Sequence, residues 1–211
     1  MRRPDITVVA IERIFPLEFE SRKPILFYPS EVEQVTGDIL EIGPGRGDLF
    51  LWLAAAHPEK RFVAIEIMMK RYGKLITRVE KRGLSNIQML RGNARVAIPR
   101  HFKTPCFERV YVLFPDPWPK PRHTHQRLLS IEFLGQLSGL LRESGDIVLA
   151  TDWQPYADWV IGNVAAVPSL RNTGTPYAQE GNFNPSGEPT FFEKLWRSKG
   201  RDIFFVRIER V

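Results

Sequence analysis

The sequence predicts an α/β fold built on a mostly parallel β-sheet, and three observations indicate it. Short apolar runs typical of buried strands alternate along the chain with amphipathic runs of helical period, which favours right-handed βαβ units. The last strand-like run alternates apolar and polar residues, as expected of an antiparallel or edge strand. With 211 residues, 43% of them hydrophobic, the chain can bury one sizeable core. We therefore expect a single domain over residues 1–211, with an N-terminal arm at 1–36 and the core at 37–211.

Each expected element follows from a local pattern. Strands are expected where four to eight apolar or alternating residues occur together, and helices where the apolar period is near 3.6. Gly83 ends the second helix, as a C-terminal glycine should. Residues 171–190 are rich in Asn, Gly, Pro and Thr and are expected to form a long loop. The expected strands are 39–42, 62–66, 87–90, 110–114, 147–150 and 202–209, and the expected helices are 48–56, 68–82 and 128–141.

Composition narrows the class of protein. The net charge of +6 and the pI of about 9.6 favour an anionic partner such as nucleic acid. Cys106 is the only cysteine, so a disulfide framework and a cysteine-based zinc site are excluded, and a reducing cytoplasm fits. His123 and His125 lack the spacing of a helical metal pair, so no metal is expected. No apolar run approaches a membrane span or a signal-peptide core, which predicts a cytoplasmic protein without a membrane partner.

The most informative segment runs from Phe114 to Lys120 and reads Phe-Pro-Asp-Pro-Trp-Pro-Lys. It follows a strand-like run directly, and its three prolines stiffen the chain because proline fixes φ and removes a donor. Asp116 and Trp118 are therefore expected to be held rigidly at the carboxyl end of a strand, where ligands bind in open α/β sheets. An acid beside a flat ring suits a nucleobase. The alternative is a proline-rich turn around a buried tryptophan.

A glycine-rich segment follows the first expected strand. Gly43, Gly45 and Gly47 allow a sharp turn and the close approach of a ligand before a helix N-terminus. Their spacing is G-x-G-x-G, whereas a dinucleotide fingerprint requires G-x-G-x-x-G. Glu41 precedes this loop, and Glu66 ends the second expected strand, where a carboxylate can accept bonds from both ribose hydroxyls. These features predict an adenosine cofactor, although Glu66 could instead pair with a lysine four positions on.

Asn93 follows the third expected strand. Its amide can both donate and accept, so it could receive an adenine ring. A turn-forming asparagine is the alternative reading of this residue.

Taken together, these motifs resemble the bacterial tRNA (guanine-N7-)-methyltransferases, which modify guanine 46 in the variable loop of tRNA. The resemblance covers roughly residues 37–210 and is most specific at Phe114–Lys120 with Arg122, His123 and Arg127. It implies a Rossmann-like class I methyltransferase with S-adenosylmethionine as cofactor and tRNA as partner, in a monomer or homodimer. It also implies a mostly parallel seven-stranded sheet with an antiparallel last strand and helices on both faces.

The resemblance assigns roles to individual residues. The loop glycines together with Glu41, Glu66, Asn93 and Asp116 would line the S-adenosylmethionine site, and Asp116 would also be the catalytic acid. The family often has Asp at the position of Asn93, so we expect an altered but intact cofactor site. The implied substrate contacts are Lys120, Asp152, Thr190, Phe191, Phe192 and Glu193.

The chemistry of guanine N7 is consistent with these residues. N7 carries an in-plane lone pair and no proton, so its methylation needs positioning and electrostatic stabilisation instead of a general base. Asp116 and Asp152, each at the end of a strand, could accept hydrogen bonds from the guanine N1–H and N2 amino groups. Trp118 could stack on the base, a contact worth about 1–3 kcal/mol.

Two basic segments could contact RNA phosphates. The loop residues Lys120, Arg122 and Arg127 are interpreted as phosphate contacts, with a solvated surface as the alternative. The second expected helix carries a basic stripe opposite an apolar face at Met68, Tyr72, Leu75 and Val79. A solvated face is the usual reading of such a stripe, and RNA contact is the alternative. The stripe residues are Lys70, Lys74, Arg78, Lys81 and Arg82.

Three rival functions are consistent with parts of the sequence. A nucleic-acid methyltransferase acting on an exocyclic amine would carry Asp-Pro-Pro-aromatic at this strand end, whereas this chain has Asp-Pro-Trp-Pro. An NAD-dependent oxidoreductase would need the other glycine spacing. A non-catalytic RNA-binding module could share the fold, since fold alone does not fix function. The acids at positions 41, 66, 116 and 152 favour an enzyme.

Overall fold

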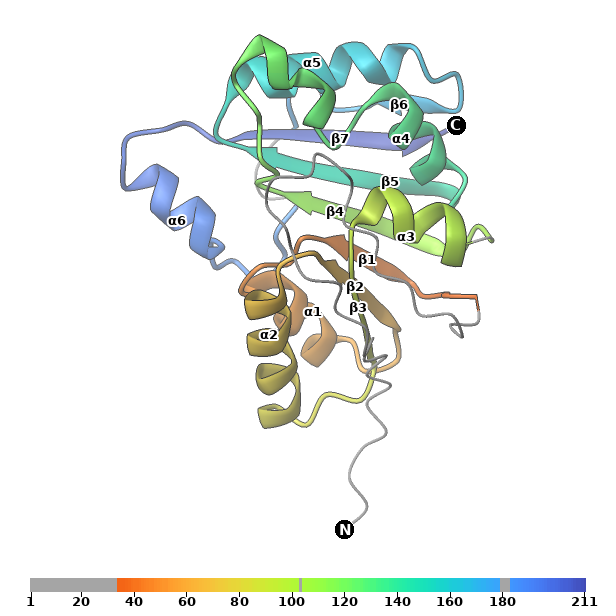
Figure 1. The fold of residues 1–211 in the computed structure, drawn as a ribbon, viewed down its shortest axis with the longest axis vertical. Coiled ribbons are helices and arrows are strands. Elements are labelled where there is room, and N and C mark those ends of the chain that lie inside the picture. Colours follow the sequence, from red (N-terminus) through yellow and green to blue (C-terminus); the bar gives the residue numbers. More distant parts are fainter. Residues whose placement is uncertain (1–33, 103, 179–182) are drawn as a thin grey trace. The chain divides into compact units, whose positions relative to one another are not determined.

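The computed structural model describes residues 34–102, 104–178 and 183–211. Its strands follow the order β3-β2-β1-β4-β5-β7-β6 in a seven-stranded sheet (Figure 1), which confirms the expected mostly parallel α/β fold with an antiparallel last strand. The chain divides into an N-terminal unit that ends at Lys103 and a C-terminal unit from Thr104 to Val211. Most of the expected arm at 1–36 lies outside the described residues, so the single-domain expectation stays a prediction.

The N-terminal unit is built from two consecutive βαβ steps and a third helix. β1 pairs in parallel with β2, and β2 pairs in parallel with β3. Every residue of β1 and β2 is buried, which explains why these strands read as continuous apolar runs instead of alternating ones. The elements are β1 (Ile39–Ile42), α1 (Asp48–Ala56), β2 (Phe62–Glu66), α2 (Met69–Lys81), β3 (Ile87–Arg91) and α3 (Ala94–His101).

Helix α2 separates an apolar face from a basic one. Tyr72, Leu75 and Val79 are buried, as the sequence predicts, and Gly83 adopts the left-handed conformation just beyond the helix end. Met68, which was expected on the apolar face, is 49% exposed because it precedes the helix as its N-cap. The basic side chains are therefore directed away from the core of this unit.

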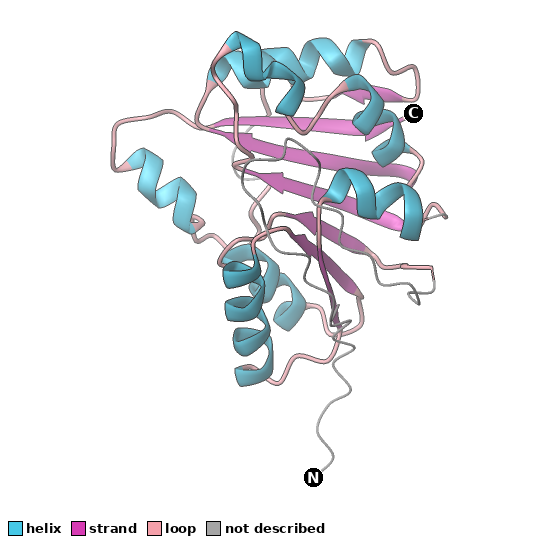
Figure 2. Cartoon of the chain, viewed as in Figure 1, coloured by secondary structure: helices cyan, strands magenta, loops and turns pink. Residues whose placement is uncertain are grey.

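The C-terminal unit combines a parallel pair of strands with an antiparallel extension. β4 runs parallel to β5, whereas β7 pairs antiparallel with both β5 and β6. Helix α6 stands apart from the strands and is joined to them by loops (Figure 2). The elements are β4 (Phe107–Leu113), the 3-10 helix η1 (Pro121–Gln126), α4 (Ile131–Ser138), β5 (Leu141–Thr151), α5 (Gln154–Ala165), β6 (Leu170–Asn172), α6 (Phe191–Arg197) and β7 (Phe204–Arg210).

Several expected boundaries in this unit are wrong, including those of the strand expected at 147–150, which extends over Leu141–Thr151 as β5. The helix expected at 128–141 is shorter because Ser130 caps it through a bond from the Phe133 N–H, and because Leu141 already belongs to β5. The fourth strand ends at Leu113, since Phe114 turns the chain with a φ of 51°. The expected loop at 171–190 includes the end of β6, which pairs with β7.

Three helices, α3, α5 and α6, were not predicted from the sequence. Pro99 lies inside α3 and obscures its period. The buried residues of α5 do follow helical spacing, at Tyr156, Ala157, Val160 and Val164, so a signal was present. The adjacent Gln154-Pro155 pair marks the first turn of α5, where proline is tolerated.

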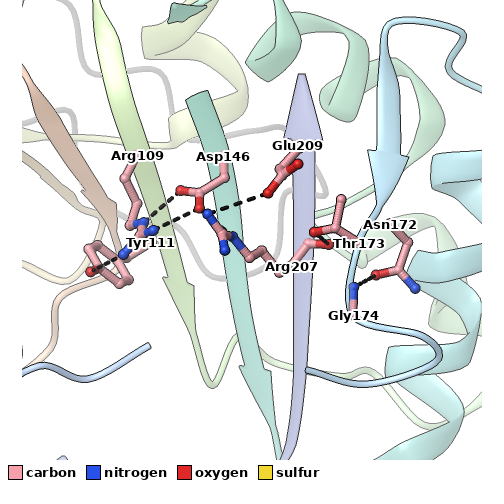
Figure 3. Close-up of polar contacts among 8 residues, drawn as sticks. All are labelled: Arg109, Tyr111, Asp146, Asn172, Thr173, Gly174, Arg207 and Glu209. Carbon is pink, nitrogen blue, oxygen red and sulfur yellow. Dashed lines mark hydrogen bonds and ion pairs between the residues drawn. The ribbon is translucent and has the colours of Figure 1, made fainter. Parts of the chain in front are cut away.

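A buried carboxylate joins three strands of the C-terminal unit (Figure 3). Asp146 on β5 is 2% exposed and accepts bonds at 2.6 and 2.8 Å from Arg109 on β4. Arg207 on β7 donates to the same carboxylate at 2.8 Å and lies 3.4 Å from Glu209. Because removing one partner would leave a buried charge, this network fixes β5 between its parallel and antiparallel neighbours.

Within the part of the chain that the structure describes, no helix combines the length and the hydrophobicity needed to cross a bilayer.

Candidate active site

The three glycines after β1 have different structural roles. Gly43, Gly45 and Gly47 all have positive φ, at 74°, 57° and 70°, which other residues rarely adopt. A Cβ on Gly47 would lie 2.4 Å from the Leu75 side chain, so this glycine allows α1 to begin close against α2. A Cβ on Gly43 would meet no atom within 4 Å, so the loop borders open space there. The loop is therefore tightly packed at Gly47 and open at Gly43.

Glu66 is tied to the glycine loop through its side chain. It is 2% exposed, and its two carboxylate oxygens accept bonds from the Gly45 N–H at 3.2 Å and the Met68 N–H at 2.8 Å. Each oxygen keeps a further lone pair, so the Glu66 carboxylate could still accept hydrogen bonds from two neighbouring hydroxyl groups. The alternative pairing with Lys70 is not formed among the described residues, because the carboxylate instead holds the loop and the start of α2.

Glu41 is a buried acid with an unused acceptor. Its side chain is 3% exposed, and within the described residues its Oε2 atom has no hydrogen-bond partner. Burial, together with the nearby negative charges of Asp48 and Glu66, raises the pKa of Glu41 from 4.5 to about 8. A ligand that carries a hydrogen-bond donor or a positive charge would provide the missing partner for this buried oxygen.

Asn93 caps helix α3, so the turn-forming reading of this residue is correct. Its Oδ1 atom accepts a bond from the Arg95 N–H at 3.0 Å. The cap does not use the Nδ2 amino group, which could donate to an acceptor such as a ring nitrogen. Glu41, Glu66 and Asn93 lie in or just after three neighbouring parallel strands, so all three are found at one edge of this unit's strands.

In the C-terminal unit, the segment Phe114–Lys120 forms a sharp elbow after β4. Phe114 and Trp118 both have positive φ, at 51° and 44°, which is strained for aromatic residues. Asp116 lies between them, is exposed, and accepts a bond from the Trp118 N–H at 3.1 Å. The elbow therefore presents a carboxylate to solvent in a backbone shape that the neighbouring structure must maintain.

Arg127 supplies much of that support, which corrects the expectation that it contacts phosphate. Its side chain is only 8% exposed, and it donates to the Pro117 carbonyl at 3.0 Å and to the Trp118 carbonyl at 3.5 Å. The guanidinium carbon also lies 5.1 Å from the ring of Trp159 and 5.2 Å from that of Trp153. Sequence reasoning identified the basic residue but not the aromatic pocket, because Trp153 and Trp159 are distant from Arg127 in the sequence.

The other basic and aromatic residues of this loop are more accessible. Lys120 and Arg122 are exposed, and the Arg122 Nε atom donates to His123 at 3.3 Å. The ring of His123 packs edge-on against Trp118, with ring centroids 5.5 Å apart. Two cations therefore remain available at this surface, beside an aromatic pair.

Asp152 immediately follows β5, and Asp116 lies shortly after β4, in the elbow that begins at Phe114. Because Leu113 and Ala150 are paired in the parallel register, the two acids lie at the same edge of the sheet in this unit. Asp152 is already engaged, since its carboxylate accepts a bond from Arg201. Sequence reasoning did not find this partner, which is 49 residues away and has no local signal.

The segment 190–193 begins helix α6, with Thr190 as its N-cap. The Thr190 hydroxyl accepts a bond from the Glu193 N–H at 3.4 Å. Glu193 is 4% exposed and receives a bond from Arg197 at 3.1 Å, so it stabilises the helix from inside. Phe191 is 39% exposed, whereas the Phe192 ring packs 6.2 Å from that of Phe114. This contact places α6 beside the elbow that carries Asp116.

Comparisons with known proteins agree with this architecture. The methyltransferase family Methyltransf_4 matches residues 36–206. A tRNA (guanine-N(7)-)-methyltransferase of Nitrosomonas eutropha is 34% identical over 186 residues, which cover 85% of this chain and 82% of the relative. A protein of the same name from Alkalilimnicola ehrlichii is 34% identical over 201 residues, with coverage of 92% and 83%.

Solved structures share the fold at low identity. The 16S rRNA methyltransferase KamB aligns with a TM-score of 0.57 at 18% identity, covering 84% of this chain and 89% of its own. The cofactor-bound protein Rv0187 aligns with a TM-score of 0.57 at 19% identity, with coverage of 82% and 72%. At such identities the likeness concerns the fold alone.

Proposed function

Because this chain belongs to the tRNA (guanine-N7-)-methyltransferase family, we propose that it transfers a methyl group from S-adenosylmethionine to N7 of guanine 46 in tRNA. One observation carries the proposal: relatives with that activity in their name align over most of both chains at about one-third identity. The family match over residues 36–206 supports it. A protein that modifies tRNA is expected in the cytoplasm.

The residues of the N-terminal unit suit the methyl donor. The open space at Gly43 admits a ligand beside the loop, and the unused Oε2 atom of Glu41 can accept from a cationic amino group. Glu66 would receive the ribose hydroxyls, and Asn93 would donate to adenine through Nδ2. Gly45 and Gly47 act by shaping this loop. The donor supplies an electrophilic methyl group on a sulfonium when it is bound.

The elbow of the C-terminal unit suits the acceptor. Guanine offers N1–H and the N2 amino group on one edge, and N7 lies on another edge, so an acid can hold the base while N7 stays free. Asp116 can accept these bonds because it is exposed and only its Oδ1 atom bonds the Trp118 N–H. As N7 gains the methyl group, positive charge develops on the ring, and a fixed carboxylate stabilises that charge.

The remaining predicted contacts serve the tRNA. Lys120 is exposed at the start of η1, where an ammonium group can meet a phosphate. Phe191 offers an exposed ring for stacking, and Thr190, Phe192 and Glu193 act by fixing that end of α6. Asp152 lies at the same edge as Asp116, so both acids would face the base.

The test is a methyl-transfer assay on an unmodified tRNA transcript and on a matched transcript in which guanine 46 is adenine. We expect one 7-methylguanosine in the first transcript, located by mass spectrometry of nuclease fragments, and none in the second. Methylation of an exocyclic amine would favour the rival methyltransferase reading. Tight tRNA binding without any methyl transfer would favour the RNA-binding module.

A further inference from the structure

Asp152 is held by a cation that no sequence motif indicates. Its side chain is 10% exposed, and its Oδ2 atom accepts a bond from the Arg201 guanidinium. Arg201 itself is half exposed, so the pair lies at the border between the protein interior and solvent. A carboxylate expected to contact the base is therefore already oriented before any substrate is bound.

Arg201 is in turn fixed to the C-terminal end of α6. Gly200 has a φ of 72°, which turns the chain back beneath the helix, and the Arg201 N–H donates to the Trp196 carbonyl at 3.1 Å. The guanidinium carbon lies 4.4 Å from the centroid of the Trp196 ring, and Lys199 approaches the same ring at 4.7 Å. Backbone and side chain together thus hold Arg201 against the last turn of α6.

The N-terminal end of α6 is attached separately. Phe192 packs against Phe114, which directly follows β4, whereas Arg201 bonds Asp152, which directly follows β5. These two contacts connect the helix, at both of its ends, to residues that follow two neighbouring parallel strands. Loss of either contact should therefore loosen the attachment of that end of α6.

We propose that Arg201 is a positioning residue that orients Asp152 and docks α6, so that the segment 190–193 is held ready for tRNA. This inference rests on the proposed function, because Asp152 and that segment are the proposed tRNA contacts. Arg201 acts through these residues and is not assigned a contact with the reacting atoms. Its guanidinium fits the role because a planar fork can bond a carboxylate and stack on an indole at once.

The experiment compares Arg201→Ala and Arg201→Lys with Lys194→Ala, which removes an exposed ion pair to Glu188 from the same helix. For Arg201→Ala we expect the KM for tRNA to rise about tenfold while the dissociation constant for S-adenosylhomocysteine is unchanged. Arg201→Lys should recover part of the loss, because it restores charge but not the planar fork. Lys194→Ala should resemble the wild type.

A second readout separates this inference from the proposed function. Hydrogen exchange of the α6 amides should be faster in Arg201→Ala than in the wild type or Lys194→Ala, whether or not the protein methylates tRNA. The double variant Arg201→Ala/Asp152→Asn should raise KM by less than the product of the two single-variant effects, because each substitution removes the same Arg201–Asp152 interaction. Unchanged α6 exchange together with an unchanged KM in a folded Arg201→Ala protein would overturn the inference.

Discussion

At the scale of single residues, Glu41 links ligand binding to protonation. Its pKa is raised to about 8, so at neutral pH the folded protein without ligand holds a proton that the unfolded chain would release. Between the ordinary pKa of 4.5 and the raised value, the folded state binds more protons, so this group's contribution to stability falls as pH rises. A buried acid of this kind is maintained at the expense of stability, which is typical of functional sites.

We therefore predict opposite effects of Glu41→Gln on stability and on binding. Removing the titrating group should raise the free energy of unfolding at neutral pH by at most about 3 kcal/mol. The decrease of this free energy between neutral pH and pH 8 should also become smaller. Affinity for S-adenosylhomocysteine, whose amino group is cationic, should rise with pH through the Glu41 pKa in the wild type but not in the variant. Chemical denaturation and calorimetry measure these quantities across the pH range.

Glu80→Gln is the matched control, because Glu80 is an exposed acid in the same unit. It should leave both pH profiles unchanged. If Glu41→Gln instead preserved the pH dependence of ligand binding, the raised pKa of Glu41 would not control the donor site.

Asp116 permits a second residue-scale prediction, because its carboxylate has two separable roles. Asp116→Asn keeps an oxygen that can accept the Trp118 N–H but removes the negative charge, whereas Asp116→Ala removes both. If charge stabilisation drives catalysis, both variants should lower kcat by about a hundredfold or more, with little change in tRNA affinity. Single-turnover methyl transfer and filter binding provide the two measurements.

A different order of effects would assign Asp116 another role. Near-normal turnover in Asp116→Asn with loss only in Asp116→Ala would mean that the acid shapes the elbow and does not stabilise charge on the base.

At the scale of elements, helix α2 presents cations that the fold itself does not use. Arg78 is committed, since it lies 4.0 Å from Asp48 and donates to the Arg46 carbonyl. Four other stripe residues are exposed and have no carboxylate partner among the described residues: Lys70, Lys74, Lys81 and Arg82. Only one acid, Glu80, occurs within the helix. This imbalance favours RNA contact over the solvated-face reading left open by the sequence.

The corresponding prediction concerns salt dependence. Replacing Lys70, Lys74 and Lys81 by Gln should weaken tRNA binding and lower the slope of log affinity against log salt by about 2 to 3, if each lysine meets a phosphate. The control replaces Arg61, Arg142 and Lys194 by Gln, which removes the same net charge from exposed ion pairs elsewhere. Equal slopes for the two triple variants would show that only net charge matters and that α2 makes no specific contact.

At the scale of the whole molecule, the sequence predicted the parts governed by local pattern. The limits of α1 and β2 coincide with the expected ones because a glycine turn and uniform burial leave clear signals. The acids at the strand ends were also predicted, because the strands that they end or follow have clear local patterns. The Arg127 pocket and the Arg201–Asp152 pair were missed because they join residues distant in sequence, and only the folded chain brings these together.

The arrangement into two units predicts that donor binding and tRNA binding can be removed independently. The proposed donor residues all lie before Lys103 apart from Asp116, whereas the proposed tRNA residues other than the α2 stripe lie after Thr104. Glu66→Ala should therefore abolish S-adenosylhomocysteine binding and leave tRNA affinity intact, because it removes the ribose acceptor and loosens the glycine loop. Lys120→Ala should weaken tRNA binding alone. Calorimetry and filter binding on both variants, with thermal melting to verify folding, test this separation, and a loss of both ligands in either folded variant would contradict it.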